Sequence, residues 1–432
     1  MKNKVNLLEQ AGALIQAIAL PHVPQDSHIK AVMDQWLHAI ATGSQFYCNP
    51  DLENSEQLKK SVISLLEQNG LYTSRKAFFD DVFGTLKLKP NFDTQFRFID
   101  LFAGIGGLRL GAQASGGACV FSSEFDTFAQ NTYSCNHGEL PFGDITKIQE
   151  KNIPDHDVLL AGFPCQPFSY SGRCEGFEDK TRGTLFFDVL RILEQKQPKF
   201  ALLENVKGFK SHNKGETMFI ALKALEEAGY NPYWTILNSY DYGVPQYRER
   251  WYCVAIRKDL GITDFSFPDL KDRKTKLRDI IDLSEEDPSL SLTSFEKERI
   301  KYHFSNYEKT ERVQHDNSMY EAHTKKGRHG VFSFLKADGS LRFHVGDVAK
   351  TQIQEAFYAC LETYAPTIIA NRVPKLWDIE RKLSVKESLR LQGFPDEFHF
   401  KVSKAQSYKQ LGNAVTVNVV KAIIEKMIKI KE

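Results

Sequence analysis

Short apolar runs alternate with helical patterns from Phe96 to Ala255, and this alternation restricts the chain to one class of fold. The runs are rich in aromatic and branched apolar residues, and the gaps between them are long enough for helices, for example over 185–195 and 217–228. Strands that are separated by helices pair in parallel, and helices then cover both faces of the sheet. The sequence therefore predicts an α/β fold with a mixed, mostly parallel sheet, whose expected strands are 96–101, 119–122, 157–161, 200–203, 234–237 and 251–255.

The segments on either side of this region have different patterns. Residues 1–95 show helical spacing without a strand pattern, and the turn-forming Pro90-Asn91-Phe92-Asp93 marks their end. After residue 258 the chain is charged, turn-rich and only patchily strand-like, which indicates a smaller, irregular unit. A capping box at Ser384 and Glu387 restores regular structure before a final helix over 415–429 that returns to the sheet. We expect a helical extension (1–95), a main domain (96–257, completed by 404–432) and a small domain (258–403).

Composition limits the classes of protein to which the chain can belong. Lys and Arg number 56 against 55 Asp and Glu, so a nucleic-acid partner would require positive charge that is focused locally. The seven cysteines include no Cys-x-x-Cys pair, which argues against a disulfide framework and a zinc site and favours a reducing cytosol. The apolar stretch 11–20 is interrupted by Gln16 and is expected to form an amphipathic helix rather than a signal peptide. No apolar run approaches the roughly 20 residues of a membrane helix, so we expect no membrane partner. From the cysteine spacing we expect no metal.

A glycine-rich turn, Asp100-Leu101-Phe102-Ala103-Gly104-Ile105-Gly106-Gly107, follows the first strand and opens a helix. In such a turn a ligand can approach backbone amides at a helix N-terminus. Glu124, at the end of the next strand, can accept hydrogen bonds from ribose hydroxyls, and Phe125 beside it can stack on adenine. Asp144 can accept a hydrogen bond from the adenine amino group. Together these residues predict a cofactor that contains adenosine.

Cys165 stands between two prolines in Gly162-Phe163-Pro164-Cys165-Gln166-Pro167-Phe168-Ser169, directly after the apolar run 158–161. Cysteine is often buried as a small apolar residue, but two prolines with a fixed φ are unusual neighbours for a core position. A turn at the end of a strand can aim backbone donors and cations at the thiol, which lowers its pKa and makes it a stronger nucleophile. We therefore predict that Cys165 is a reactive residue.

In this region and near its C-terminus the sequence resembles the DNA (cytosine-5) methyltransferases, which have a Rossmann-like fold. The resemblance covers roughly residues 96–257 and 381–432, and the extension is similar to that of enteric bacterial DNA-cytosine methylases. The long variable region is similar in position to their target-recognition domain. The seven motifs, in the family's order, are Phe98-Ile99-Asp100-Leu101-Phe102-Ala103-Gly104, Gly162-Phe163-Pro164-Cys165-Gln166-Pro167-Phe168, Arg182-Gly183-Thr184-Leu185-Phe186, Glu204-Asn205-Val206, Gln246-Tyr247-Arg248-Glu249-Arg250, Leu391-Gln392-Gly393-Phe394-Pro395 and Gly412-Asn413-Ala414-Val415.

The resemblance implies a covalent mechanism, because carbon 5 of cytosine is a poor nucleophile. Cys165 matches the thiolate that adds to carbon 6, and Glu204 matches the acid that protonates or hydrogen-bonds ring nitrogen 3. Arg248 and Arg250, expected on one face of a strand, match the pair that holds the base and the Cys165 region. The target cytosine has to leave the duplex, and residues 169–180 resemble the mobile loop that closes over it.

The resemblance also assigns the other site residues to two ligands. Thr367 with its aliphatic neighbour resembles a pair that supports the DNA strand near the flipped base, and Arg372 is a candidate reader of guanine in the motif-free stretch 258–380. The residues expected to contact DNA are Gln166, Ser169, Ser171, Arg173, Gln246, Thr367 and Arg372. The residues expected to bind S-adenosylmethionine, the implied methyl donor, are Phe102, Ala103, Gly104, Gly106, Glu124, Phe125, Asp144, Ile145, Pro164, Leu185, Asn413 and Ala414.

Two alternatives to a DNA methyltransferase remain. A tRNA cytosine methyltransferase shares most of these motifs, but it usually lacks the extension and carries a Cys-Phe-Thr sequence that is absent here. A catalytically inactive DNA-binding regulator on the same fold would not require Cys165, Glu204 and both arginines, all of which are present. The resemblance further implies double-stranded DNA as partner, a cognate restriction endonuclease as a candidate second partner, and action as a monomer in the bacterial cytoplasm, at the nucleoid.

Overall fold

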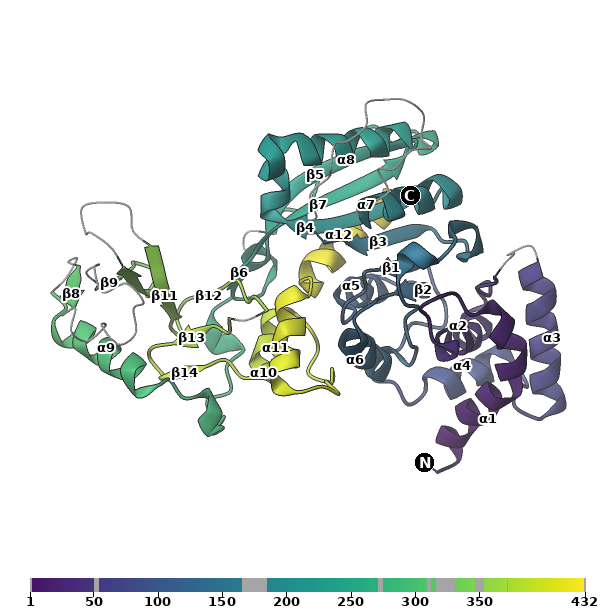
Figure 1. Ribbon diagram of the computed structural model, residues 1–432, viewed down its shortest axis with the longest axis horizontal. Helices are drawn as coiled ribbons and strands as arrows, with labels where there is room; N and C mark the ends of the chain where they lie inside the picture. Colours follow the sequence, from purple (N-terminus) through teal and green to yellow (C-terminus); the bar gives the residue numbers. More distant parts are fainter. Residues whose placement is uncertain are drawn as a thin grey trace.

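The computed structural model of the protein describes residues 2–49, 54–164, 185–270, 275–308, 312–315, 331–345, 353–370 and 372–430. Figure 1 shows three parts in a row. A central sheet lies in the middle, a helical N-terminal extension lies beside β2, and a peripheral unit with a second sheet lies at the opposite end of the molecule.

The central sheet has six strands in the order β2-β1-β3-β4-β7-β5. The pairs β1–β2, β1–β3 and β3–β4 are parallel, whereas β7 is antiparallel to β4 and to β5. The strand order reverses at β1, and ligands bind at the carboxyl ends of the strands at such a switch point. The six strands expected from the sequence are confirmed as β1 (Phe96–Leu101), β2 (Gly117–Ser123), β3 (Val158–Gly162), β4 (Phe200–Val206), β5 (Tyr230–Asn238) and β7 (Glu249–Arg257).

Helices cover both faces of the central sheet, as the alternation predicts. Successive residues of a strand point to opposite faces, so that Phe98, Leu160 and Leu202 pack with α5 and α12. Ile99, Leu159 and neighbouring residues of the other face pack with α7, α8 and the extension. The expected return of the C-terminal helix is confirmed. The helices of the central unit are α5 (Gly107–Ala114), α6 (Thr127–His137), α7 (Leu185–Lys196), α8 (Glu216–Glu227) and α12 (Val417–Lys429).

The extension shares one hydrophobic core with the central sheet. Residues of α2 such as Trp36 belong to the same buried cluster as Val120 of β2. The ring of Tyr47 packs against Phe142 at 4.6 Å and against Phe121 at 6.0 Å between centroids. The boundary expected at residue 95 therefore separates two sequence patterns that pack as one body. The helices of the extension are α1 (Lys2–Ala19), α2 (Ile29–Thr42), α3 (Ser55–Gln68) and α4 (Arg75–Phe83).

The side chain of Gln35 makes one buried hydrogen bond across this boundary and two further hydrogen bonds within the extension. Its Nε2 donates to the carbonyl of Val120 and to that of Gln45, each at 3.0 Å. Its Oε1 accepts from the amide of Tyr47 at 2.8 Å. A buried polar group is costly unless it is paired, so the bond to Val120 holds α2 on β2, and the bonds to Gln45 and Tyr47 hold α2 against the segment that follows it.

A buried ion-pair chain makes a second link between the extension and the central unit. His38 of α2 lies 2.7 Å from Glu139, which also pairs with Arg109 of α5. Burial alone would raise the pKa of Glu139, but Arg109 and His38 lower it below the ordinary value of a glutamate. The extension thus contacts the helix that the glycine-rich turn opens.

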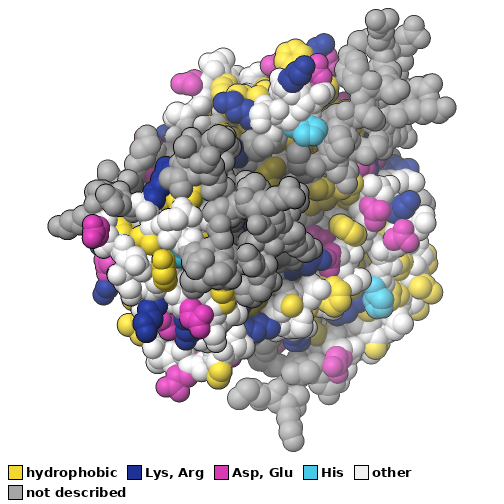
Figure 2. Space-filling model, turned by 60° about the vertical axis from the view of Figure 1, so that its left-hand side comes forward, with side chains coloured by type: hydrophobic (Ala, Val, Ile, Leu, Met, Phe, Trp, Pro, Cys, Tyr) yellow, Lys and Arg dark blue, Asp and Glu magenta, His cyan; other side chains and the backbone are white. Residues whose placement is uncertain are grey.

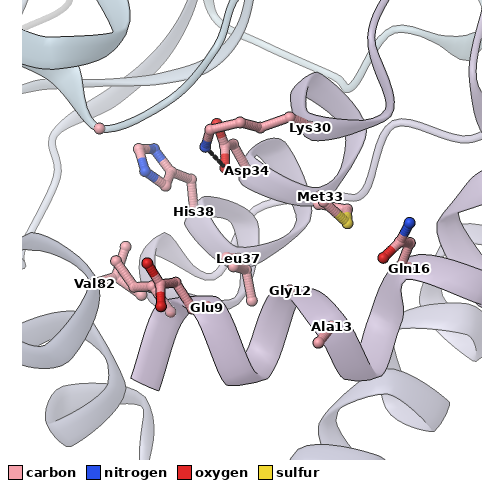
Figure 3. Close-up of a pocket in the computed structure, with 12 residues that line it drawn as sticks. Glu9, Gly12, Ala13, Gln16, Lys30, Met33, Asp34, Leu37, His38 and Val82 are labelled. Atoms are coloured by element: carbon pink, nitrogen blue, oxygen red, sulfur yellow. Dashed lines mark hydrogen bonds and ion pairs between the residues drawn. The ribbon is translucent and has the colours of Figure 1, made fainter. Parts of the chain in front are cut away.

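A cavity of about 380 Å³ lies between α1, α2 and the loop after α6 (Figure 3). The ion pair of Lys30 and Asp34 forms part of one wall, with His38 beside it. Apolar side chains that include Met33 and Leu37 form much of the rest. Its described lining contains none of the predicted cofactor residues, so this cavity is not the predicted cofactor site.

The peripheral unit is more regular than the sequence pattern predicts, because it contains a second six-stranded sheet in the order β14-β13-β11-β10-β9-β8. The helix α9 (Ser294–Ser305) packs Ile300 against one face of this sheet, on Val331, Phe343 and Tyr358. Several of the strands are only two or three residues long, so their alternation is weak in the sequence. The strands are β8 (Val313–His315), β9 (Val331–Leu335), β10 (Leu341–Val345), β11 (Ile353–Ala359), β13 (Lys375–Leu376) and β14 (Arg381–Lys382).

On the face that Figure 2 shows, the coloured charged side chains are dispersed. Figure 2 brings the side of the peripheral unit forward and shows Lys and Arg scattered among hydrophobic side chains. Within the described ranges, no group of three or more His, Cys, Asp or Glu residues is placed to hold a metal ion. The same part of the chain includes no helix that is both long and apolar enough to span a membrane.

Candidate active site

The glycine-rich turn lies at the carboxyl end of β1, at the switch point of the central sheet. Phe102, Gly104 and Gly106 have positive φ angles of 54°, 55° and 90°. A Cβ at Gly106 would lie 2.3 Å from Nε2 of His137, so this position requires glycine. A Cβ at Gly104 would meet nothing within 4 Å, so the turn is open on that side, as a ligand-binding turn must be.

Glu124, at the end of β2, is tied to this turn. Its carboxylate accepts from the amide of Gly104 at 2.7 Å and from the amide of Asp126 at 2.8 Å. Burial raises the pKa of Glu124, although these amides favour the charged form. The ring of the neighbouring Phe125 is 74% exposed, an unusual state for a phenylalanine and one that leaves its face open for stacking.

The other described residues of the predicted cofactor site lie on adjoining loops. Asp144 accepts from the amide of Thr146 at 2.9 Å and so holds a short turn in which Ile145 is buried. Asn413 ends α11 (Lys404–Asn413) with an exposed side chain, and the next residue, Ala414, is only 8% exposed. The fold therefore supplies an open turn, an exposed ring and polar groups, which suit an adenosine-containing ligand.

Glu204, near the end of β4, is a buried carboxyl beside a cation. Its Oε1 lies 3.3 Å from Nε of Arg250, whose strand β7 pairs with β4. Burial raises the pKa of Glu204, and Arg250 and Arg248 offset only part of that rise. The carboxyl therefore keeps its proton to a higher pH than an ordinary glutamate and can act as a donor.

The end of the Cys165 segment that the structure describes lies next to Glu204. Gly162 of β3 is the register partner of Glu204, and a Cβ at Gly162 would lie 3.5 Å from Oε2 of Glu204. Asn205 donates from Nδ2 to the carbonyl of Phe163 at 3.0 Å, two residues before Cys165. Asn205 belongs to one of the seven motifs, but only the structure shows that its side chain holds the backbone of Phe163.

Several predicted residues lie outside the described ranges. They are Cys165, Gln166, Ser169, Ser171 and Arg173. The flanking residues are described: Pro164 is exposed and Leu185, which begins α7, is partly buried.

Arg248 lies between β6 (Gln246–Tyr247) and β7, and its side chain is buried. It donates to the carbonyls of Ile368, Gly412 and Ala414 at 2.8–3.1 Å. Burial, together with the charge of Arg250, lowers the pKa of Arg248 to about 9, so it remains a cation at neutral pH. The two arginines thus have different contacts. Arg250 pairs with the candidate acid, whereas Arg248 joins its own segment to those of Ile368 and Gly412, and we call this meeting point the junction.

Gln246 belongs to the same junction, although the sequence predicts a DNA contact for it. Its side chain is fully buried, its Oε1 accepts from the amide of Ile368, and its Nε2 donates to the carbonyl of Leu391 and to Oε1 of Gln392. With these groups engaged inside the protein, Gln246 presents no surface to DNA in this structure. Its position favours a role in ordering the junction.

Thr367 and Arg372 flank a tight turn beside this junction. Thr367 donates to the carbonyl of Tyr247 at 2.8 Å, and its residue is partly exposed. The side chain of Arg372 is exposed, while its backbone pairs with that of Ile369. A Cβ at Gly412 would lie 2.4 Å from the carbonyl carbon of Ile369, so the end of α11 packs directly on the turn.

Comparisons with known proteins agree with this geometry. The family described as C-5 cytosine-specific DNA methylase matches residues 96–429. The chain is 38% identical over 339 residues to Type II methyltransferase M.HhaI of Haemophilus parahaemolyticus, covering 78% of this chain and 96% of that protein. It is 41% identical over 344 residues to Type II methyltransferase M.HpaII of Haemophilus parainfluenzae, covering 78% of this chain and 91% of that protein. The extension lies outside the residues that the family matches.

Solved structures are similar in fold. The S. pombe Dnmt2 methyltransferase matches with a TM-score of 0.53 and 18% identity, over 78% of this chain and 100% of that one. A putative DNA modification methyltransferase encoded within an E. coli prophage matches with a TM-score of 0.53 and 21% identity, over the same shares. These likenesses support the methyltransferase-type α/β fold that the sequence predicts.

Proposed function

The chain belongs to the C-5 cytosine-specific DNA methylase family, and from this premise we propose that it methylates carbon 5 of cytosine in double-stranded DNA. The observation that carries the proposal is the arrangement at the ends of β3 and β4. The strand that leads to Cys165 lies beside Glu204, a buried carboxyl with a raised pKa that pairs with Arg250. A nucleophile and a proton donor on adjacent strand ends are what addition to a cytosine ring requires.

Each of these residues has a defined part in the proposal. The thiolate of Cys165 bonds to carbon 6 of the ring, and the displaced electron pair makes carbon 5 nucleophilic. Protonated Glu204 donates to ring nitrogen 3, and Arg250 orients its carboxyl. Once carbon 5 carries the methyl group that the cofactor would supply, loss of the carbon 5 proton to a base returns the electron pair of that C–H bond to the ring and expels Cys165 as a thiolate.

We propose S-adenosylmethionine as the cofactor, which supplies an electrophilic methyl group when it is bound. The open turn around Gly104, the exposed ring of Phe125 and the carboxylates of Glu124 and Asp144 support its adenosine end. The remaining predicted cofactor residues are assigned to the same ligand. They are Phe102, Ala103, Gly106, Ile145, Pro164, Leu185, Asn413 and Ala414.

Sequence choice is assigned to the peripheral unit. We propose that residues 258–403 recognise the target word, while residues 96–257 with 404–432 carry out the reaction. In the same proposal the protein acts as a monomer in the bacterial cytoplasm, at the nucleoid, alongside a cognate restriction endonuclease. The matching family, described as C-5 cytosine-specific DNA methylase, favours DNA over tRNA as substrate.

Bisulphite sequencing tests this function and reports the target word at once. Genomic DNA from cells that express the protein should resist conversion at cytosines of one word, and DNA from cells that express Cys165→Ala should not. Total tRNA from the same cells should show no added 5-methylcytidine. Full conversion of the DNA at every word, despite soluble protein, would exclude the DNA methyltransferase function.

A further inference from the structure

The residues that lead from α6 to Asp144 run beside the end of β2. They are residues 139–143, and we call them the linking segment. The amide of Phe142 donates to the carbonyl of Ser122, and the carbonyl of Phe142 accepts from the amide of Glu124, each at 2.9 Å. Because Asp144 follows directly, the place of the linking segment along β2 sets where Asp144 lies relative to Glu124.

The linking segment is also hydrogen-bonded to the extension. The hydroxyl oxygen of Ser27, just before α2, accepts from the amide of Gly143 at 3.0 Å. The carboxylate of Asp34, in α2, accepts from the amide of Leu140 at 2.8 Å. Both donors are backbone groups, so these two bonds hold the path of the chain between β2 and the extension.

The extension approaches the linking segment closely at both of its ends. At the start, Glu139 pairs with His38, which lies four residues after Asp34 on the same side of α2 (Figure 3). At the other end, a Cβ at Gly143 would clash with the carbonyl oxygen of Asp26, so the close approach of the extension requires glycine here. The extension therefore packs directly on the residues that precede Asp144.

We propose that Ser27, Asp34 and His38 are positioning residues for the cofactor, which they affect through the linking segment. They hold Asp144 in place beside Glu124, so the extension forms an outer layer of the S-adenosylmethionine site. The extension lies outside the residues that the family matches, so this role adds to what the family supplies. The inference rests on the proposed function, in which Asp144 and Glu124 bind the adenosine end.

The test measures the affinity of the full chain for S-adenosylmethionine by titration calorimetry in the absence of DNA. Ser27→Ala removes the acceptor of Gly143, and we expect affinity to fall on the order of fivefold for this one lost hydrogen bond. Ser27→Thr keeps a hydroxyl and should restore most of the affinity. With saturating cofactor, kcat of Ser27→Ala should equal that of the wild type, because Ser27 acts on cofactor binding alone.

The matched control is Ser74→Ala. Ser74 also accepts from a backbone amide of the extension, that of Ala77 at 3.2 Å, but it caps α4. Each variant loses one hydrogen bond of the same kind, so a loss of stability alone would affect both. Only Ser27→Ala should bind the cofactor more weakly.

A double-mutant cycle determines whether Ser27 acts through Asp144. In an Asp144→Ala background, Ser27→Ala should weaken binding by less than about twofold further, because the group that it positions is gone. Full additivity of the two losses, an unchanged affinity of Ser27→Ala, or an equal loss in Ser74→Ala would each overturn the inference.

A second variant covers a failure of Ser27→Ala to fold. Asp34→Ala removes the acceptor of Leu140 and should give a similar loss of affinity, and unchanged binding by this variant would overturn the inference. Absence of cofactor binding by the wild type would instead refute the proposed cofactor.

Discussion

Replacing Gln35 by leucine should destabilise the central sheet as well as the extension. Leucine keeps most of the volume but removes the donor to Val120 and the acceptor for Tyr47, and both backbone groups are left buried without that partner. Each unpaired group costs about 1–3 kcal/mol, so we expect a loss of about 3 kcal/mol in the free energy of unfolding. The control, Gln57→Leu on the exposed side of α3, should change it by less than about 0.5 kcal/mol.

Hydrogen exchange read by mass spectrometry locates the effect. A loss of about 3 kcal/mol raises the opening equilibrium roughly 100-fold. Because the extension and the sheet share one core, peptides of β1 and β2 should exchange faster together with those of α2. Faster exchange confined to α1–α4, with β1 and β2 unchanged, would refute the single-core interpretation.

Three further outcomes follow from the site. Glu204→Gln should lower kcat by about 10²- to 10⁴-fold and leave cofactor affinity unchanged. In the wild type kcat should fall as pH rises through the raised pKa of Glu204, because the protonated form is the donor. A pH-independent kcat would argue against that role. Phe125→Ala should weaken S-adenosylmethionine binding in calorimetry by about 1 kcal/mol and leave DNA binding unchanged, whereas equal cofactor affinity would remove the stacking role. Gly412→Ala should lower the thermal midpoint of unfolding, at a cost of about 1–3 kcal/mol, because the new Cβ would lie 2.4 Å from the amide nitrogen of Ala370. Gly208→Ala should leave the midpoint unchanged, because a Cβ there would meet no atom within 4 Å. Equal midpoints for the two variants would contradict this packing.

The central sheet could be predicted because its inner strands are buried on both faces. Such strands appear in the sequence as continuous apolar runs, as 158–161 does. The peripheral sheet has one face of mixed polar and aromatic residues, and β13 and β14 have two residues each. Its pairing depends on contacts between distant segments, which a local pattern does not encode.

The candidate site was predictable in its residue types and less so in its contacts. The motifs indicated Glu204 and Arg250, and the structure places them 3.3 Å apart. The burial of Gln246 and the carbonyl contacts of Arg248 involve partners more than 100 residues away. The docking of α2 on β2 by Gln35 spans 85 residues, so periodicity within the extension could not predict it.

The most direct test of the central claim is a covalent adduct with DNA that carries 5-fluorocytosine at the target position. Fluorine cannot leave carbon 5 as a proton does, so the bond between Cys165 and carbon 6 should persist in the presence of S-adenosylmethionine. Cys174, a second cysteine in the segment 169–180, provides the control, because it is not expected to take part in the reaction. On a denaturing gel the wild type and Cys174→Ala should migrate as a protein–DNA adduct, and peptide mapping should place the DNA on Cys165. An adduct that survives Cys165→Ala, or methylation by that variant, would contradict the account.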